Sequence, residues 1–140
     1  MSAWLRLLAS IGASALIVAA LMASVWVLVP WVQTIAAGAP VSLAALVRAW
    51  RRGLRIHEIV TAYLVSAKAG VEASFEQYAD LLALGGQPIR VATMLAAMRY
   101  ADFPHEPARV FDLERRGMLA EYFKAWQRAA AGRQPPPPLP

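Results

Sequence analysis

The sequence predicts an all-α protein in which a membrane-embedded N-terminal segment precedes an interfacial amphipathic helix and a small bundle of short helices. Two observations carry this prediction: an uncharged run from Leu7 to Val47, and alanine- and leucine-rich segments bounded by helix caps, with few strand signals. The absence of cysteine excludes a disulfide scaffold and a cysteine-ligated metal site. We expect four parts: residues 1–40, membrane-embedded; 41–55, a basic interfacial helix; 56–131, a small helical domain; and 132–140, a proline-rich disordered tail.

Charge is distributed unevenly along the chain. The protein carries 14 basic and nine acidic residues, a net charge of +5, and the first acidic residue is Glu58. The whole net charge therefore lies between the N-terminus and Arg55, in and beside the apolar run. Such a cluster favours an anionic lipid surface as partner, because it can follow the negative potential of the inner leaflet. We do not expect nucleic acid as a partner.

The apolar run is too long for a soluble helix in so small a chain. Its core, Ile11 to Val29, is apolar on all faces, and it exceeds the apolar region of a secretory signal, although Ala37-Gly38-Ala39 resembles a cleavage site. A straight helix over the whole run would reach ~60 Å against a hydrocarbon core of ~30 Å. The run must therefore break.

Three residues mark where the run can bend, namely Pro30, Gly38 and Pro40. Proline removes a helix hydrogen bond, and small residues favour a turn. Two topologies are consistent with this pattern: a single span over about 9–29 followed by an interfacial segment, or a re-entrant hairpin with its bend near Pro30.

Tryptophans and arginines lie within and beside the run, at positions that suit membrane interfaces. The tryptophans that we expect as membrane-interface anchors are Trp4, Trp26, Trp31 and Trp50. The arginines that we expect to contact lipid headgroups or to set topology are Arg48, Arg51, Arg52 and Arg55. They place the downstream helices in the cytoplasm by the positive-inside rule, and Arg6 opposes this only weakly.

The segment after Pro40 reads as an amphipathic helix on the membrane surface. Ser42 is a candidate N-cap and Gly53 a stop signal. Apolar residues recur at intervals of three and four, with the arginines towards the other side; these residues are Leu43, Leu46, Val47 and Trp50.

Caps divide the remaining chain into helices. The first runs from Ile56 to Ala69 and stops at Gly70, the second opens with a capping box at Ser74, and the third begins at Pro88. A last helix begins at Pro107, and its inner face is expected to use Val110, Phe111, Leu119, Tyr122, Phe123 and Trp126. The tail from Pro135 to Pro140 favours an extended polyproline helix.

Residues from Val29 to about Phe123 resemble the N-terminal region of the bacterial flotillin-like (FloA) family. The matching residues are Val29-Pro30, Ile35-Ala36-Ala37-Gly38, Val41-Ser42, Leu46-Val47, Arg51-Arg52, Ile59-Val60, Ala67-Lys68-Ala69-Gly70, Leu84-Gly85-Gly86, Arg90-Val91 and Asp112-Leu113. The resemblance implies a scaffold anchored in the bacterial inner membrane, forming homo-oligomers or pairing with a full-length flotillin-like protein or a small NfeD-type membrane protein. The band-7 (SPFH) domain and the coiled coil that follow in this family are not found in this sequence.

The sequence does not predict a catalytic or metal-binding site. His57 and His105 are far apart, each is followed by a glutamate, and adjacent residues do not share a helix face. We therefore expect no enzyme, no cofactor and no metal site. Two functions fit the sequence: a membrane-anchored scaffold or adaptor organising a protein and lipid assembly, and an accessory structural subunit of a larger integral membrane complex.

Overall fold

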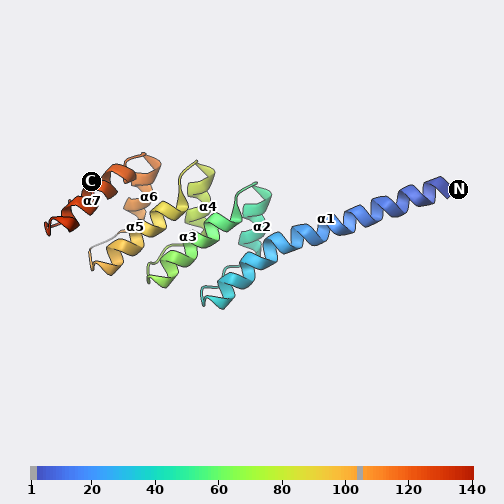
Figure 1. Cartoon of the computed structure of the whole chain (residues 1–140), viewed down its shortest axis with the longest axis horizontal. Helices are drawn as coiled ribbons and strands as arrows, with labels where there is room; N and C mark the ends of the chain where they lie inside the picture. The colour runs from blue at the N-terminus through green and yellow to red at the C-terminus, as the bar shows by residue number, and fades with distance from the viewer. Residues whose placement is uncertain (1–2, 104–105) are drawn as a thin grey trace.

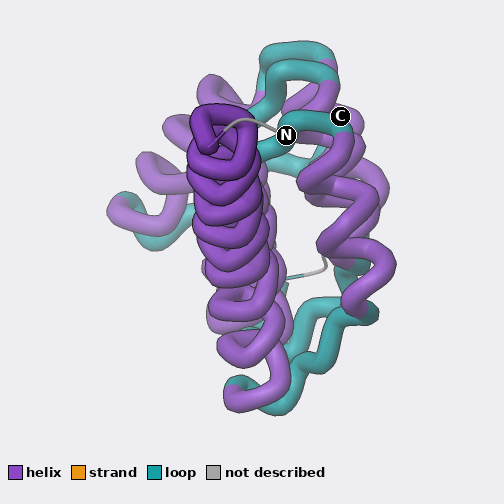
Figure 2. Tube along the Cα trace, turned by 90° about the vertical axis from the view of Figure 1, so that its right-hand side faces the viewer, coloured by secondary structure: helices purple, strands orange, loops and turns teal. Residues whose placement is uncertain are grey.

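The protein is a chain of helices, seen in a computed structural model that describes residues 3–103 and 106–140. Within those residues there are helices and loops but no strand (Figures 1 and 2). This confirms the all-α prediction and the long apolar helix at the N-terminus. The helices are α1 (Ala3–Ala36), α2 (Leu43–Arg51), α3 (Ile56–Lys68), α4 (Phe75–Ala83), α5 (Pro88–Tyr100), α6 (Pro107–Arg115) and α7 (Leu119–Ala131).

The first helix does not break at Pro30. α1 runs for 34 residues with Pro30 inside it, and the chain turns only after Ala36, where Gly38 adopts a φ of +72°. Pro30 is buried against the following helices, and this packing offsets the hydrogen bond that proline removes. The structure therefore differs from the hairpin with a bend near Pro30, whereas Gly38 and Pro40 do lie in the turn between α1 and α2.

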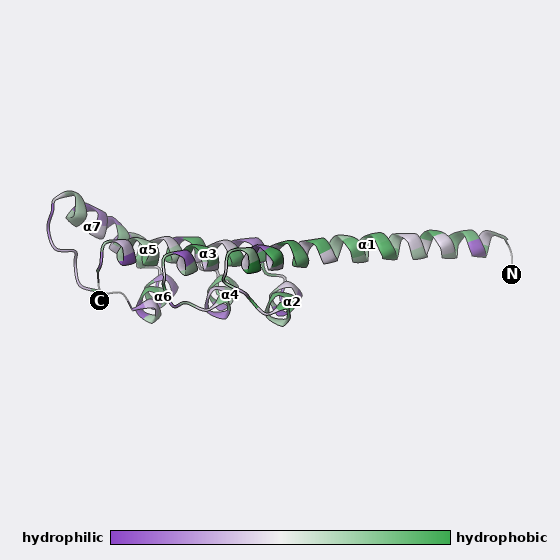
Figure 3. Cartoon of the chain, turned by 90° about the horizontal axis from the view of Figure 1, so that it is seen from below, coloured by the Kyte–Doolittle hydropathy of each residue, from purple (hydrophilic) through white to green (hydrophobic). Residues whose placement is uncertain are grey.

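The helices form two layers. The long helices α1, α3, α5 and α7 lie side by side in one layer, and the short helices α2, α4 and α6 form the other (Figure 3). Each short helix packs against the long helices on either side of it in the chain. We call α2 to α7, with the end of α1 that packs on them, the helical array.

The array is built from a repeated helix pair. Left-handed glycines end the short helices at Gly53, Gly85 and Gly117, which are evenly spaced along the chain. Gly38, Gly70 and Asp102 follow the long helices at the same spacing, all with positive φ. A helix pair repeated at a fixed period is the architecture of an α-solenoid, in which each unit packs only on its neighbours. The helices that we expected to form a small bundle are therefore stacked in a linear array.

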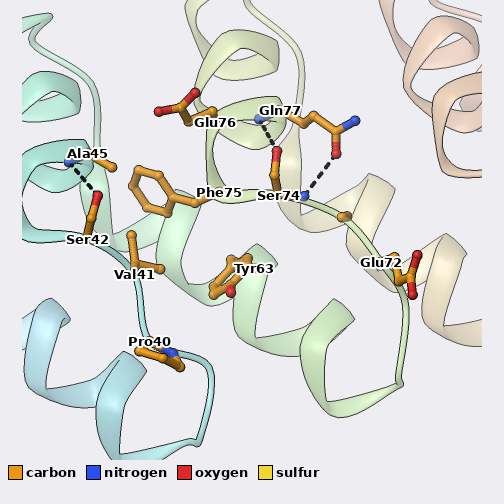
Figure 4. Close-up of a pocket in the computed structure, with 11 residues that line it drawn as sticks. Pro40, Val41, Ser42, Ala45, Tyr63, Glu72, Ser74, Phe75, Glu76 and Gln77 are labelled. Carbon is orange, nitrogen blue, oxygen red and sulfur yellow. Dashed lines mark hydrogen bonds between the residues drawn. The ribbon is translucent and has the colours of Figure 1, made fainter.

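Helix caps explain where the first units begin. The Ser42 hydroxyl accepts a hydrogen bond from the Ala45 N–H, and Ser74 forms a complete capping box with Gln77 (Figure 4). Pro88 occupies the first turn of α5. These starts confirm the sequence signals.

The last predicted helix is in fact two. α6 ends at Arg115 and α7 begins at Leu119, because Gly117 turns the chain with a φ of +72°. The prediction of one helix from Pro107 was wrong at this point. Of its expected inner face, Val110, Phe111, Leu119 and Tyr122 are buried, and Phe123 and Trp126 are partly buried against the core.

The core runs through the whole array and includes α2. Equivalent positions of the three short helices, Leu46, Tyr78 and Val110, are fully buried. Leu46 was expected in a stripe facing the bilayer, but it packs inside the array. We expected residues 41–55 to lie apart from the domain at 56–131; in the structure they are continuous with it.

The proline-rich tail folds back on the last helix pair. It contains no helix, but the Tyr122 hydroxyl donates a hydrogen bond to the Pro137 carbonyl at 3.0 Å. Leu139 is partly buried against the core. In the structure the segment covers part of the C-terminal end of the array.

Candidate membrane interface

The outer two thirds of α1 are not buried by the array. Side chains from residue 3 to residue 26 are exposed, except for the half-buried Ala23, and the helix projects alone from the array (Figures 1 and 3). By length and composition, α1 is a candidate to cross a membrane. Its exposure distinguishes it from the core helix of a soluble protein, because soluble monomers rarely expose apolar patches beyond a few hundred Å².

The inner end of α1 belongs to the array. Val27, Pro30 and Thr34 are buried, and the Thr34 hydroxyl accepts a hydrogen bond from the Val41 N–H at 3.5 Å. The helix therefore changes from fully exposed to packed within one turn near Trp26. That change marks the level at which a membrane surface would end and the array begin.

The four predicted anchor tryptophans lie at three places along the length of α1: near its free end, where it enters the array, and within the array. Trp4 is exposed near the free end of α1, while Trp26 on α1 and Trp50 on α2 are exposed where α1 enters the array. Trp31 is different, since it packs against the core and is only partly exposed. Three of the four are thus placed where an interfacial side chain is useful, and Trp31 has a packing role.

Two of the four predicted headgroup arginines form ion pairs with residues of another array helix. Arg48 pairs with Glu76 at 2.6 Å and Arg52 with Asp80 at 3.1 Å, both across to α4. All four side chains of these pairs are largely exposed, so each pair contributes little stability. Sequence reasoning missed these partners because they lie 28 residues away.

The other two arginines lie around the turn between α2 and α3. Arg55 pairs with Glu58 at 2.7 Å and stays highly exposed. Arg51 is exposed and has no ion pair within the part of the chain that the structure describes. Of the four predicted headgroup arginines, Arg51 is therefore the most available to a lipid phosphate.

An apolar groove joins these features. It has a volume of about 640 Å³ and lies where α1 enters the array, between α1 and the turn that leads into α3. Apolar side chains dominate its walls, and Arg55, His57 and Glu58 lie at its rim; the wall residues include Val25, Trp26, Val29, Pro30, Trp50 and Leu54. Such a groove fits an apolar chain with a polar end better than a polar metabolite.

A second depression lies at the other edge of the array, between the caps of α2 and α4 (Figure 4). Its lining combines Ser42, Tyr63 and Phe75 with the carboxylates Glu72 and Glu76. The two serines in Figure 4 are already bonded to backbone N–H groups. The depression therefore reads as the gap between two repeats.

Charged groups inside the array have structural roles. Glu114 is buried, accepts a hydrogen bond from the Gln87 N–H at 2.9 Å, and pairs with Arg90 at 2.8 Å. It joins α6 to the turn before α5. Within residues 3–103 and 106–140, no three histidine, aspartate or glutamate side chains gather into a metal-binding group. His57 lies at the groove rim, and His105 is outside the described residues.

One tyrosine is strongly affected by burial. Tyr78 lies in the centre of the array, fully buried, with its ring 5.0 Å from that of Phe111. Desolvation raises the pKa of Tyr78 from 10.0 to about 12, although Ser66 acts in the opposite direction. The phenol is thus neutral over the physiological range and serves packing.

Comparison with known proteins finds no match to a family model, a curated protein or a solved structure. The flotillin-like resemblance thus stays a prediction from the residues quoted above.

Proposed function

We propose that this protein is a membrane-anchored, non-enzymatic scaffold of flotillin-like type, with α1 crossing the bilayer once and the helical array held at the cytoplasmic surface. The observation that carries the proposal is the exposed outer part of α1. Residues 3–26 are about 36 Å long as a helix, against ~30 Å of hydrocarbon. Exposure of so long an apolar helix surface to water is unfavourable, whereas lipid would bury it.

Charge supports the orientation. Arg6 is the one charged residue in α1 and lies one turn from its free end, where its side chain can reach the headgroups. Four arginines follow on α2 and the turn after it, and this excess favours the cytoplasmic side. The resemblance to flotillin-like proteins adds the bacterial inner membrane as the location.

The continuity of α1 argues against removal of this segment as a secretory signal. Cleavage after the Ala37-Gly38-Ala39 turn would take away Val27, Pro30 and Thr34, which are buried against the array. The first long helix of the array would be lost with them. A retained anchor is therefore the better reading of the apolar run.

A scaffold needs surfaces and no reaction centre. A linear array presents its repeats side by side, which is how solenoid proteins bind extended partners. An accessory subunit of a larger membrane complex is the second candidate, because Leu43 and Val47 stay exposed on α2, beyond the proposed span. That alternative predicts stoichiometric co-purification with another membrane protein.

Alkaline extraction of membranes from cells that express the full chain tests the anchoring. We expect the protein to remain in the pellet with its full length, as an integral membrane protein does. Recovery in the soluble fraction, or a shortened chain that begins after Ala39, would contradict the proposal. A variant with Leu16→Arg and Ile17→Arg is the control, since it should be released.

A further inference from the structure

One face of α1 carries a regular seam of exposed side chains. Its positions alternate in steps of four and three residues, and each of them is exposed. These positions are Leu7, Ile11, Ser14, Val18, Leu21, Val25, Leu28, Val32 and Ile35. Steps of four and three keep side chains on one stripe of a helix, and they are the pattern by which two helices pair as a coiled coil.

The seam differs in composition from the rest of the apolar helix. From Leu7 to Val25, every seam position except Ser14 is leucine, isoleucine or valine, while most of the intervening residues are alanine, glycine or serine. A helix selected only to be apolar would not need its large side chains gathered on one stripe. The arrangement fits helix pairing in addition to anchoring.

The repeat shows that one inner position of the seam, Leu28, is a packing position. Leu28 is equivalent to Val60 on α3 and to Ala92 on α5, which occupy the same place in the next two repeats. Leu28 is 44% exposed, whereas Val60 and Ala92 are 1% and 0% exposed. The later helices bury this position against the preceding helix of the array, and it is open on α1, the first helix that the structure describes.

The same comparison extends to the short helices. Leu43 and Val47 of α2 are 42% and 37% exposed, whereas their equivalents on α4, Phe75 and Ala79, are 5% and 4% exposed. The open end of the array thus exposes apolar side chains on both α1 and α2. It presents the face that a further repeat would cover.

The opposite end of the array is not open in this way. The tail crosses it, with the Tyr122 hydroxyl bonded to the Pro137 carbonyl and Leu139 packed against the core. Head-to-tail stacking of copies would have to displace the tail. An open end that meets the open end of a second copy avoids this and gives a closed pair.

We propose that a second copy of this chain pairs along the α1 seam, from the membrane helix into the open end of the array, to form a parallel two-fold dimer. The parallel orientation rests on the proposed membrane anchoring, which holds both copies in the same sense. In lipid the seam side chains contribute packing. Beyond the bilayer, Leu28, Val32 and Ile35 add the burial of apolar surface.

Cysteine cross-linking tests the seam, since the chain has no native cysteine. Full-length variants in reconstituted bilayers would carry one cysteine each, either on the seam (Leu21→Cys, Val32→Cys) or beside it at the same depth (Ala20→Cys, Gln33→Cys). A mild oxidant should shift most of each seam variant to the mass of a dimer. The matched neighbours should stay monomeric.

Two outcomes would overturn the dimer. One is equal cross-linking of seam and neighbouring cysteines, and the other is no cross-linking in a chain that alkaline extraction shows to be inserted. Failure of α1 to insert into the membrane would instead contradict the proposed anchoring. In that case the Val32→Cys and Gln33→Cys variants, cross-linked in detergent solution, still decide whether the seam pairs.

Discussion

The outer part of α1 and the helical array are both rich in apolar residues, yet they place them in opposite environments. In residues 3–26 nearly every large side chain is exposed, whereas the array holds leucines and valines of the same size, such as Leu46, Leu81 and Val91, at zero exposure. The array reaches this with helix pairs whose apolar faces meet, whereas no other helix of the same chain packs on the outer part of α1. On the proposed anchoring, the difference adapts the protein to two solvents, water around the array and lipid around α1.

Removing residues 3–24 gives the largest expected effect, because it deletes one region and keeps the other. We expect this variant to leave the membrane completely and to remain helical, since Val27, Pro30 and Thr34 are retained. Membrane fractionation and circular dichroism measure the two properties. A variant lacking residues 3–38 is the comparison, and it should lose helicity and cooperative unfolding as well.

A leucine in each region sharpens the contrast. Leu46→Ala should lower the free energy of unfolding of the array by about 2–5 kcal/mol, because it leaves a cavity in a fully buried site. Leu16→Ala, on the exposed outer helix, should leave that free energy unchanged. Both are measured by denaturant titration in the same micelles. Equal losses at the two sites would remove the distinction between the regions.

The buried Tyr78 gives the array a pH dependence that α1 lacks. Folding raises the pKa of Tyr78 from 10.0 to about 12, so the folded protein holds the phenolic proton more tightly than the unfolded chain. The stabilisation is complete below pH 10 and is lost as pH rises from 10 to 12, by about 2 kcal/mol. Unfolding of Tyr78→Phe should show less of this decline, and an identical slope in both proteins would contradict it.

Glycine substitution should have different effects in a turn between array helices and within the long helix α1. Gly117→Ala has space for the new methyl group, but its φ of +72° is unfavourable for alanine, so we expect a loss of about 1–2 kcal/mol. Gly12→Ala also has space and lies within α1, so it should not destabilise. Thermal unfolding of the two variants gives the comparison.

The smallest effects are expected from the arginines. Arg52→Gln removes an exposed ion pair with Asp80 and should cost less than about 1 kcal/mol, with the difference vanishing at high salt. Arg51→Gln breaks no ion pair and should leave the free energy of unfolding unchanged, while weakening association of residues 41–55 with anionic vesicles. A flotation assay at low and high salt measures the second effect; unchanged flotation would remove lipid headgroups as partners of Arg51.

Local signals in the sequence predicted much of the fold, because they act over a few residues. The caps at Ser42 and Ser74, the proline start of α5 and the stop at Gly70 each depend on neighbours within one turn, and each is present in the structure. The uncharged run likewise predicted the long helix. Gly117 was the missed signal of this kind.

Local sequence signals did not predict the repeated arrangement of helices in the array. Its repeat is carried by evenly spaced turn positions, while the helices between them differ in sequence. Gly53 and Gly85 therefore read singly as ordinary stops, and Gly117 was not read as one. The partners of Arg48 and Arg52 depend on how α2 and α4 are stacked, which no local pattern contains. Comparison of the spacing of the glycines would have revealed the repeat, and with it the stacking of neighbouring short helices.

The topology of α1 is tested most directly by labelling from outside the cell. Two single-cysteine variants, Ser2→Cys at the N-terminus and Thr93→Cys at an exposed position of α5, would be treated with a membrane-impermeant maleimide in intact inner-membrane spheroplasts. A single crossing with the array in the cytoplasm predicts that the Ser2→Cys variant is labelled and the Thr93→Cys variant only after lysis. Protection of both, or labelling of Thr93→Cys in intact cells, would contradict it.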